Sequence, residues 1–209
     1  MSFVLIVKVR DLNNVEHYIG IDGCKSGWIA IHNVNGEYSY QVLKNLKELT
    51  HYSALNTRVL IDMPLGLSSQ NNKRTIDKTL RKALSQRKSS VFNAPCREAL
   101  AAKDYANASE ISRQIEGKGL SLQSFYLFPK IGELESFYLE SERSNILIYE
   151  SHPEFCFENL QTAGLKVAHN KKTSEGALQR LALLSHHNGA CIPLYNKVVS
   201  ETKRKDVAK

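Results

Sequence analysis

The chain has 209 residues, of which 42% are hydrophobic and 23% are charged. These proportions are typical of a folded globular protein and exclude wholesale disorder, and the length suits one domain with a full core. Lysine and arginine total 28 against 21 aspartate and glutamate residues, which gives a formal net charge of +7. This excess is compatible with a polyanionic partner such as nucleic acid, but proteins that never bind nucleic acid also carry it.

The cysteines and the start of the chain indicate the compartment. No two of the four cysteines stand at a CxxC spacing, which is typical of reduced thiols in a cytoplasmic protein. These residues are Cys24, Cys96, Cys156 and Cys191. The apolar run at residues 3–7 is too short for a signal peptide or a membrane span, so we expect an edge strand there and no membrane partner.

The first segment of the chain has a clear pattern of strands. Strands are predicted over residues 18–22, 28–34 and 37–43, with Asn35-Gly36 as a tight hairpin turn between the last two. Apolar residues at helical spacing predict a helix over residues 46–55. The apolar run at residues 59–61 then suits the buried centre of a sheet that is covered on both faces.

The remainder of the chain is predicted to be mostly helical. A helical insertion is expected at about residues 70–140, with helices over residues 73–86, 97–116 and 129–139. A buried strand follows at residues 145–149. Short helices are expected over residues 153–160 and 173–184, and residues 193–209 are predicted to begin as strand or loop and to end in a basic tail. We therefore expect one α/β domain over residues 1–209.

Three acidic residues stand where predicted strands end. Asp22, Asp62 and Glu150 each directly follow an apolar strand, and ligands of α/β sheets gather beyond strand tips. Carboxylates that converge raise one another's pKa unless a cation neutralises them. Oxygen ligands favour Mg²⁺ or Mn²⁺, the usual ions of phosphoryl transfer. The three acids together predict a metal site, although for any one acid alone a loop cap or an ion pair with lysine or arginine is the better explanation.

Five motifs in this order resemble a known family. They lie at residues 20–28 (GIDGCKSGW), 61–67 (IDMPLGL), 89–95 (SSVFNAP), 129–133 (PKIGE) and 150–154 (ESHPE). Together they resemble the predicted RNase H-like nucleases known as domain of unknown function four hundred and twenty-nine, which are distantly similar to the RuvC Holliday-junction resolvases. The resemblance covers about residues 18–184.

The resemblance implies a fold and a set of ligands. The expected fold is the three-layer RNase H-like α/β fold, with a five-stranded mixed sheet flanked by helices. By the same implication Asp22 on the first strand is the central metal ligand, and Asp62 and Glu150 are the acids of the fourth and fifth strands. The nuclease label of that family is itself an inference from fold.

Basic and polar side chains near the motifs are candidates for substrate binding. A basic segment over residues 73–88 leads into Ser90 and contains Arg81 and Arg87. It could hold a phosphate backbone, although a solvated helix face is the more common role of such a run. Lys25 lies in the first motif and is a further candidate. Lys130 could reach a phosphate or could be a surface lysine at a helix start.

His152 stands between Glu150 and Glu154. It could support the acids or shuttle a proton, but a histidine before proline in a loop is more often structural. The expected function is therefore divalent-metal-dependent hydrolysis of phosphodiesters in DNA or RNA. Two alternatives stay open: a phosphotransferase or ATPase of the related actin-like group, and a non-catalytic module that binds nucleic acid or protein.

The last residues lead to a separate expectation. In resolvase-type nucleases a closing helix carries a further acid for the second metal ion. Residues 203–209 resemble only the first turn of such a helix, with Asp206 suited to its N-cap. We therefore expect little nuclease activity from the chain as it stands. The absent helix would also leave an apolar strip of the sheet uncovered, which favours a homodimer.

Overall fold

The computed structural model describes residues 16–53, 56–141 and 145–202. The edge strand expected at residues 3–7 and the helical turn expected at residues 203–209 lie outside the described residues. The chain folds as two compact units. The first unit comprises Met1–Asp62 and Glu140–Lys209, and the second comprises Met63–Leu139. Each unit is described by itself below.

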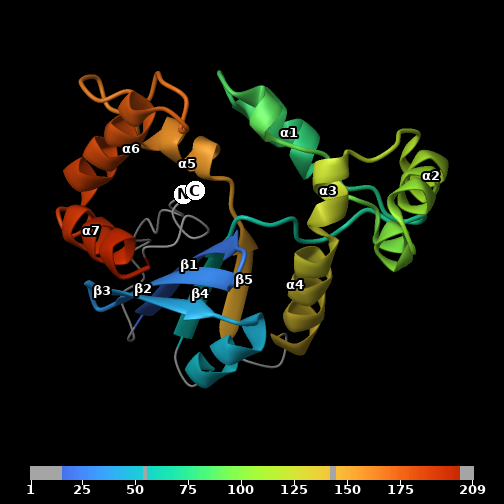
Figure 1. The fold of residues 1–209 in the computed structure, drawn as a ribbon, viewed down its shortest axis with the longest axis horizontal. Coiled ribbons are helices and arrows are strands. Elements are labelled where there is room, and N and C mark those ends of the chain that lie inside the picture. The colour runs from blue at the N-terminus through green and yellow to red at the C-terminus, as the bar shows by residue number, and fades with distance from the viewer. Residues whose placement is uncertain (1–15, 54–55, 142–144, 203–209) are drawn as a thin grey trace. The chain divides into compact units, whose positions relative to one another are not determined.

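The first unit contains a five-stranded mixed sheet in the order β3-β2-β1-β4-β5 (Figure 1). β2 pairs antiparallel with β1 and β3, whereas β4 pairs parallel with both β1 and β5. With helices on its flanks, this is the RNase H-like arrangement, and the expected fold class is confirmed. The strands are β1 (Glu16–Cys24), β2 (Gly27–Val34), β3 (Glu37–Leu43), β4 (Asn56–Ile61) and β5 (Ile146–Glu150).

Two tight turns set the register of the first three strands. Asn35 and Gly36 have φ values of 53° and 92°, so both adopt the left-handed conformation that a two-residue hairpin turn requires. Gly27, with a φ of 132°, begins β2. A Cβ atom there would overlap the carbonyl oxygen of Leu43, so the close approach of β2 and β3 requires glycine at this position.

One face of the sheet is covered by a 3₁₀ helix, η1 (Leu46–Tyr52), where an α-helix was expected over residues 46–55. Its Tyr52 ring lies 4.8 Å from the ring of His17, centroid to centroid, and the Tyr52 carbonyl accepts a hydrogen bond from Thr57 Oγ1. Leu46 and Leu49 are fully buried. The helix therefore covers the face that carries the side chains of His17 and Thr57.

Helix α7 (Cys191–Thr202) covers part of the opposite face, and the strand or loop predicted from residue 193 was wrong. Leu194 and Val198 lie one helical turn apart and pack in one core cluster with Ile29 and Ile31 of β2. Burial of these two side chains overrides the weak helix propensity of the β-branched residues.

The other helices of this unit begin close to where they were predicted. α5 spans Pro153–Leu160, and α6 spans Ser174–His187. On β5, Leu147 and Tyr149 are about half-exposed, with 51% and 47% of their surface accessible. They are exposed apolar side chains of the kind expected on an uncovered strip, and the homodimer stays a prediction.

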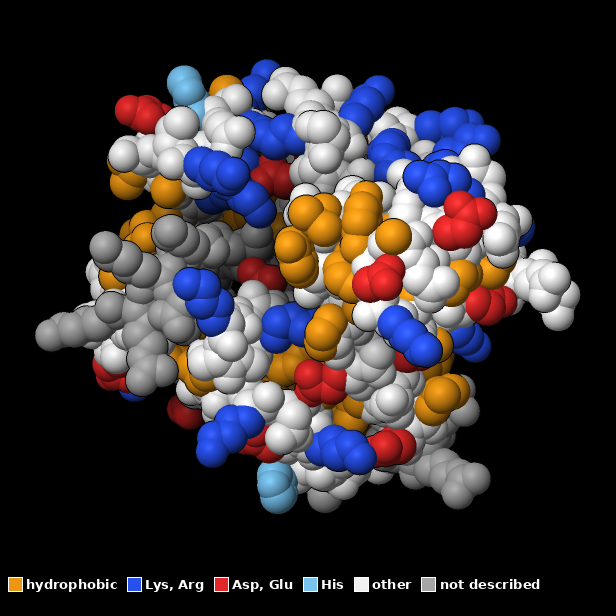
Figure 2. Space-filling view, turned by 45° about the vertical axis from the view of Figure 1, so that its right-hand side comes forward, with side chains coloured by type: hydrophobic (Ala, Val, Ile, Leu, Met, Phe, Trp, Pro, Cys, Tyr) orange, Lys and Arg blue, Asp and Glu red, His pale blue; other side chains and the backbone are white. Residues whose placement is uncertain are grey.

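The second unit is helical, as the predicted insertion was. Its core cluster is formed by buried hydrophobic residues, which are Cys96, Ala99, Ala108, Leu120 and Phe128. The unit's helices are α1 (Ile76–Ala83), η2 (Lys88–Ser90), η3 (Arg97–Ala101), α2 (Tyr105–Glu116), α3 (Leu122–Tyr126) and α4 (Phe128–Ser141), the last of which continues into the first unit. Figure 2 shows a face on which hydrophobic side chains gather beside lysine and arginine side chains.

Two details of the second unit differ from the sequence prediction. The single helix expected over residues 97–116 is divided, because Asp104 caps the start of α2 and accepts a hydrogen bond from the backbone N–H of Asn107 at 2.8 Å. Helix α3 was not predicted, and Ser121 caps it in the same way. Among the described residues, no helix is long and apolar enough to cross a membrane.

Candidate functional site

The strand register brings the three predicted acids to one end of the sheet. Ile21 of β1 pairs with Ile61 of β4, and the N–H of Asp62 donates to the carbonyl of Ile21 at 3.1 Å. Asp22 and Asp62 therefore follow paired residues on neighbouring parallel strands. Glu150 pairs with Ile61 on the other side of β4. The backbone therefore places all three acids at the same end of the sheet.

The three acids are not equivalent in this register. Glu150 lies opposite Ile61 rather than opposite Asp62, so it stands one residue further back along the sheet. Side chains alternate between the two faces of a strand, and paired residues share a face. By this alternation Glu150 starts on the face of Ile61, whereas Asp22 starts on the opposite face. Asp22 and Asp62 thus form the closer pair. Glu150 lies at the same end of the sheet, at the end of the neighbouring strand β5.

The surroundings of Asp62 raise the pKa of its carboxyl group. Burial raises the pKa of the Asp62 carboxyl to about 7, and the negative charge of Asp22 adds to this effect. Lys171 opposes it, while Glu150 and Glu154 contribute further increases. The pKa of Asp62 therefore lies near neutral pH. A cation placed among these carboxylates would favour its ionised form.

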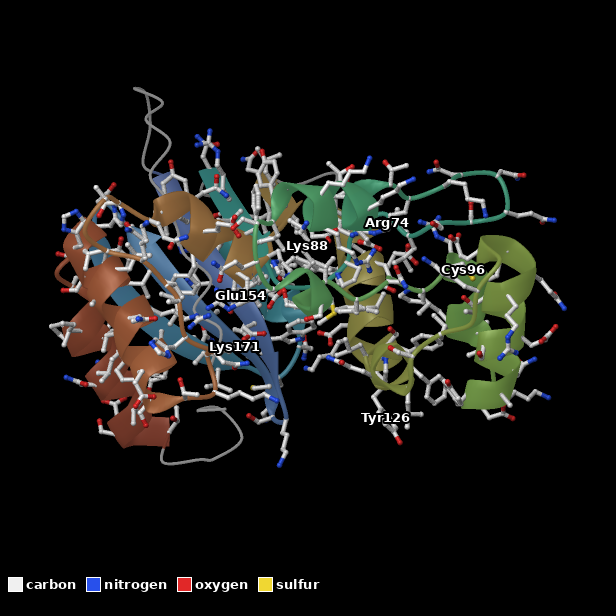
Figure 3. All side chains as sticks on the ribbon, turned by 90° about the horizontal axis from the view of Figure 1, so that it is seen from above. Arg74, Lys88, Cys96, Tyr126, Glu154 and Lys171 are labelled. Carbon is white, nitrogen blue, oxygen red and sulfur yellow. The ribbon has the colours of Figure 1, made fainter. Side chains whose placement is uncertain are left out.

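Glu154 and Arg180 form a buried ion pair beside these acids. Arg180 Nη2 lies 2.9 Å from Oε1 and 2.7 Å from Oε2 of Glu154, and both residues are 6% exposed. Glu154 is in the first turn of α5, directly after the strand that ends in Glu150. Figure 3 labels Glu154 and Lys171, which lie in the same region of the first unit. The pair fixes the start of α5 against α6.

His152 is the N-cap of α5. Its Nδ1 accepts a hydrogen bond from the backbone N–H of Phe155 at 3.3 Å, so this ring nitrogen carries the lone pair. The proton of the neutral ring is then on Nε2. The N-cap is a structural role for His152, and its expected role beside the acids stays a prediction. Lys25 is exposed in the turn between β1 and β2.

The other candidates for substrate binding belong to the second unit. Arg81 Nη2 donates to the carbonyl of Val91 and to Asn93 Oδ1, each at 2.8 Å, so its guanidinium holds the loop after η2. The hydroxyl of Ser90 donates to the carbonyl of Arg87 at 2.7 Å, and the backbone of Arg87 is left-handed, with a φ of 55°. Lys130 is half-buried in α4.

Sequence reasoning missed Lys171 and Arg180, and it quoted Glu154 only as part of a motif. The partner of Arg180 lies 26 residues away in the chain, so no local spacing indicates the pair. A glutamate two residues after His152, at the start of a predicted helix, was the one available signal, since carboxylates stabilise helix N-termini.

The donor chemistry of the site suits a hard divalent cation, but the side chains do not form a ready coordination shell. Within the described ranges, no group of three or more His, Cys, Asp or Glu side chains is placed to hold a metal ion. Carboxylate oxygens are nevertheless the ligands that Mg²⁺ and Mn²⁺ prefer. Burial, and after it the negative charge of Asp22, raises the pKa of Asp62, and a bound cation would oppose both effects. By charge and ligand type, Asp22 and Asp62 fit such an ion, with Glu150 beside them.

Comparison with known proteins gives one match. The family model described as "Protein of unknown function (DUF429)" matches residues 20–209. All five motifs quoted above lie within the matched residues. No curated protein and no solved structure matches the chain.

Proposed function

The chain belongs to the DUF429 family, and we propose that it is a divalent-metal-dependent nuclease that hydrolyses phosphodiester bonds in DNA or RNA. The observation that carries this proposal is the convergence of Asp22 and Asp62 at the ends of two paired parallel strands. Glu150 follows on the third of three adjacent strands. The RNase H-like arrangement of the sheet and the resemblance to predicted nucleases support the same reaction.

In this proposal Asp22 and Asp62 hold Mg²⁺ or Mn²⁺, and Glu150 contributes a further oxygen. When bound, the ion supplies an activated water and compensates the charge on the phosphate. Asp62 must lose its proton to serve as a ligand, and its pKa of about 7 means that this occurs near neutral pH. Arg180 keeps Glu154 in place, so the turn between β5 and α5 is fixed before any ion binds.

The second unit would contribute nucleic-acid binding in this proposal. Along α1 and the turn that follows, Lys78, Lys82 and Lys88 have exposed side chains. Contacts between lysine and phosphate provide affinity without sequence preference. Arg81 supports the same segment from within.

A non-catalytic module that binds nucleic acid or protein is the second candidate. It is favoured by one observation, which is that no three potential ligands in the described part of the chain lie ready to hold a metal ion. Such a protein would bind oligonucleotides without cleaving them. The phosphotransferase alternative would instead turn over ATP.

The test is a cleavage assay with end-labelled single-stranded DNA, duplex DNA and RNA in the presence of Mn²⁺ or Mg²⁺. We expect cleavage by the wild type that Asp22→Asn and Asp62→Asn each reduce at least about hundredfold, a loss on the scale of a missing charge-stabilising group. Glu37→Gln removes an exposed acid at the start of β3 and is the matched control. Cleavage that survives Asp22→Asn, or binding with no cleavage under any condition, would contradict the proposal. Phosphate release from ATP is measured in parallel.

A further inference from the structure

Helix α1 places none of its side chains in a core. None of its residues is buried, and Ile76 leaves 47% of its surface accessible. Figure 1 shows the helix extending from the other helices of the second unit. The buried side chain of Leu84 follows the last turn and supports only that end. Because a helix this short is at best marginally stable in water by itself, other contacts must keep α1 helical.

An ion pair that is mostly buried anchors the first turn of α1. Oδ1 of Asp77 accepts hydrogen bonds from Nε and Nη2 of Arg74, at 2.9 and 2.8 Å. The side chains of Arg74 and Asp77 are 5% and 17% exposed. Nη1 of Arg74 also donates to the carbonyl of Leu65, and Oδ2 of Asp77 accepts from the backbone N–H of Ala94 at 3.0 Å. This one pair therefore ties α1 to the loops that precede and follow it.

Arg81 holds the following loop from the same helix. Its Nε and Nη2 donate to the carbonyl of Val91, at 3.1 and 2.8 Å, and Nη2 also donates to Oδ1 of Asn93 at 2.8 Å. Asp77 and Arg81 lie four residues apart, so they are neighbours on one side of the helix. That side of α1 is attached by charged and polar contacts.

Two lysines form a second row on α1. Lys78 and Lys82 are also four residues apart, and both are exposed. The unit that carries them, Met63–Leu139, contains 12 lysine and arginine residues against 7 aspartate and glutamate residues. Most of the positive surplus of the chain therefore belongs to this unit, which suits a polyanionic partner.

We propose that Asp77 is a positioning residue for nucleic-acid binding, an acid that holds α1 through Arg74 so that Lys78 and Lys82 face the phosphate backbone together. The inference rests on the proposed function and assigns the residue that arranges its binding surface. By charge alone, an acid next to these lysines opposes the binding of phosphate. The anchoring contacts act in the opposite direction, because a frayed α1 must be ordered again before its lysines can bind.

The two effects differ in sign, so a charge-matched pair of variants separates them. Fluorescence anisotropy with a labelled oligonucleotide at low salt compares the wild type, Asp77→Asn and Glu110→Gln. Both variants remove one negative charge from the second unit, but Glu110 lies on α2 in an exposed ion pair with Arg113. We expect Asp77→Asn to bind about tenfold more weakly, as when only a tenth of the molecules keep α1 ordered. Glu110→Gln should bind as tightly as the wild type or slightly more tightly. Unchanged or tighter binding by Asp77→Asn would overturn the inference.

A second measurement needs no nucleic acid. Hydrogen exchange followed by mass spectrometry reports the opening of α1 and α2 separately. In Asp77→Asn we expect faster exchange in α1 and unchanged exchange in α2, whereas Glu110→Gln should leave α1 as it is in the wild type. Unchanged exchange in α1, or loss of protection throughout α2 as well, would overturn the local role of Asp77. A wild type that binds no oligonucleotide would instead contradict the nucleic-acid part of the proposed function, so the two failures are distinguishable.

Discussion

Arg180 Nη2 contacts both carboxylate oxygens of Glu154, at 2.9 and 2.7 Å, in a part of the first unit where both residues are buried. Nη1 of the same guanidinium donates to the carbonyls of Gly176 and His169, at 2.8 and 3.1 Å. One side chain therefore connects α5, α6 and the loop that carries Lys171. The proposed site depends on this connection for its shape.

Removal of Arg180 should be strongly destabilising. We expect Arg180→Met to lower the free energy of unfolding by about 3–5 kcal/mol, because it leaves the Glu154 carboxylate buried without its partner. Urea denaturation measures the change. The matched control is Arg113→Met, which removes an exposed ion pair with Glu110 and should cost less than about 1 kcal/mol. Similar losses of unfolding free energy in both variants would show that the buried ion pair contributes no more to stability than the exposed one.

Two glycines in helices provide a second test of the loop. Gly176→Ala should destabilise the protein, because its methyl group would overlap the carbonyl oxygen of Asn170. Gly132 in α4 has open space around the equivalent position, so Gly132→Ala should stabilise by about 0.5–1 kcal/mol through helix propensity alone. Thermal unfolding of the two variants should therefore shift in opposite directions. A stabilised Gly176→Ala protein would show that the loop is not packed against α6.

A buried pair of histidines should make stability depend on pH. His17 Nε2 lies 3.0 Å from His32 Nδ1, and both residues are buried. Burial lowers the pKa of His32 to about 4, and the charge of His17 adds to this effect. Burial also lowers the pKa of His17. The folded protein therefore binds fewer protons here than the unfolded chain does, and stability decreases as the pH falls from about 6.5 toward 4.

The expected loss from His32 alone is on the order of 3 kcal/mol between neutral pH and pH 4. His32→Gln keeps a polar side chain that does not titrate, so the difference in unfolding free energy between wild type and variant should shrink over this window. Urea denaturation at several pH values measures it. His186→Gln, at an exposed position on α6, is the control. A difference that does not change with pH would contradict the burial of two neutral rings.

The basic segment of the second unit can be tested for nucleic-acid binding. If Lys82 contacts phosphate, Lys82→Ala should reduce the slope of log affinity against log salt by roughly 0.7–0.9. Arg81→Ala should mainly destabilise the unit, because its guanidinium holds Val91 and Asn93. Fluorescence anisotropy with a labelled oligonucleotide measures both effects. No binding at low salt would leave this segment a solvated helix face.

Local patterns in the sequence predicted the strands and the acidic residues at the strand ends. Asp22 and Asp62 each follow an apolar run, and the hairpin at Asn35 and Gly36 has its own turn signal. These features depend on a few adjacent residues. The sheet then brings the strand ends together by pairing, which is why the common position of these acids at one end of the sheet could be predicted without coordinates.

The supporting contacts could not be predicted because they join distant segments. Arg180 and Glu154 meet only after α5 and α6 pack, and Arg180 contacts the carbonyl of His169 in the loop before α6 only in the same packed arrangement. α7 was missed for a similar reason, since Leu194 and Val198 gain their burial from strands far back in the chain. Both the Arg180–Glu154 contact and helix α7 therefore depend on tertiary packing and not on local sequence.

Mn²⁺ titration of the wild type, Asp22→Asn, Asp62→Asn and the control Glu37→Gln by isothermal calorimetry tests the central claim most directly. We predict that the wild type and Glu37→Gln bind Mn²⁺ at pH 7.5 and that both aspartate variants lose this binding. The aspartate variants should fold normally without metal, because each substitution relieves repulsion between Asp22 and Asp62. Equal binding by all four proteins, or no binding by the wild type, would contradict the claim that these strand-end acids form a divalent-metal site.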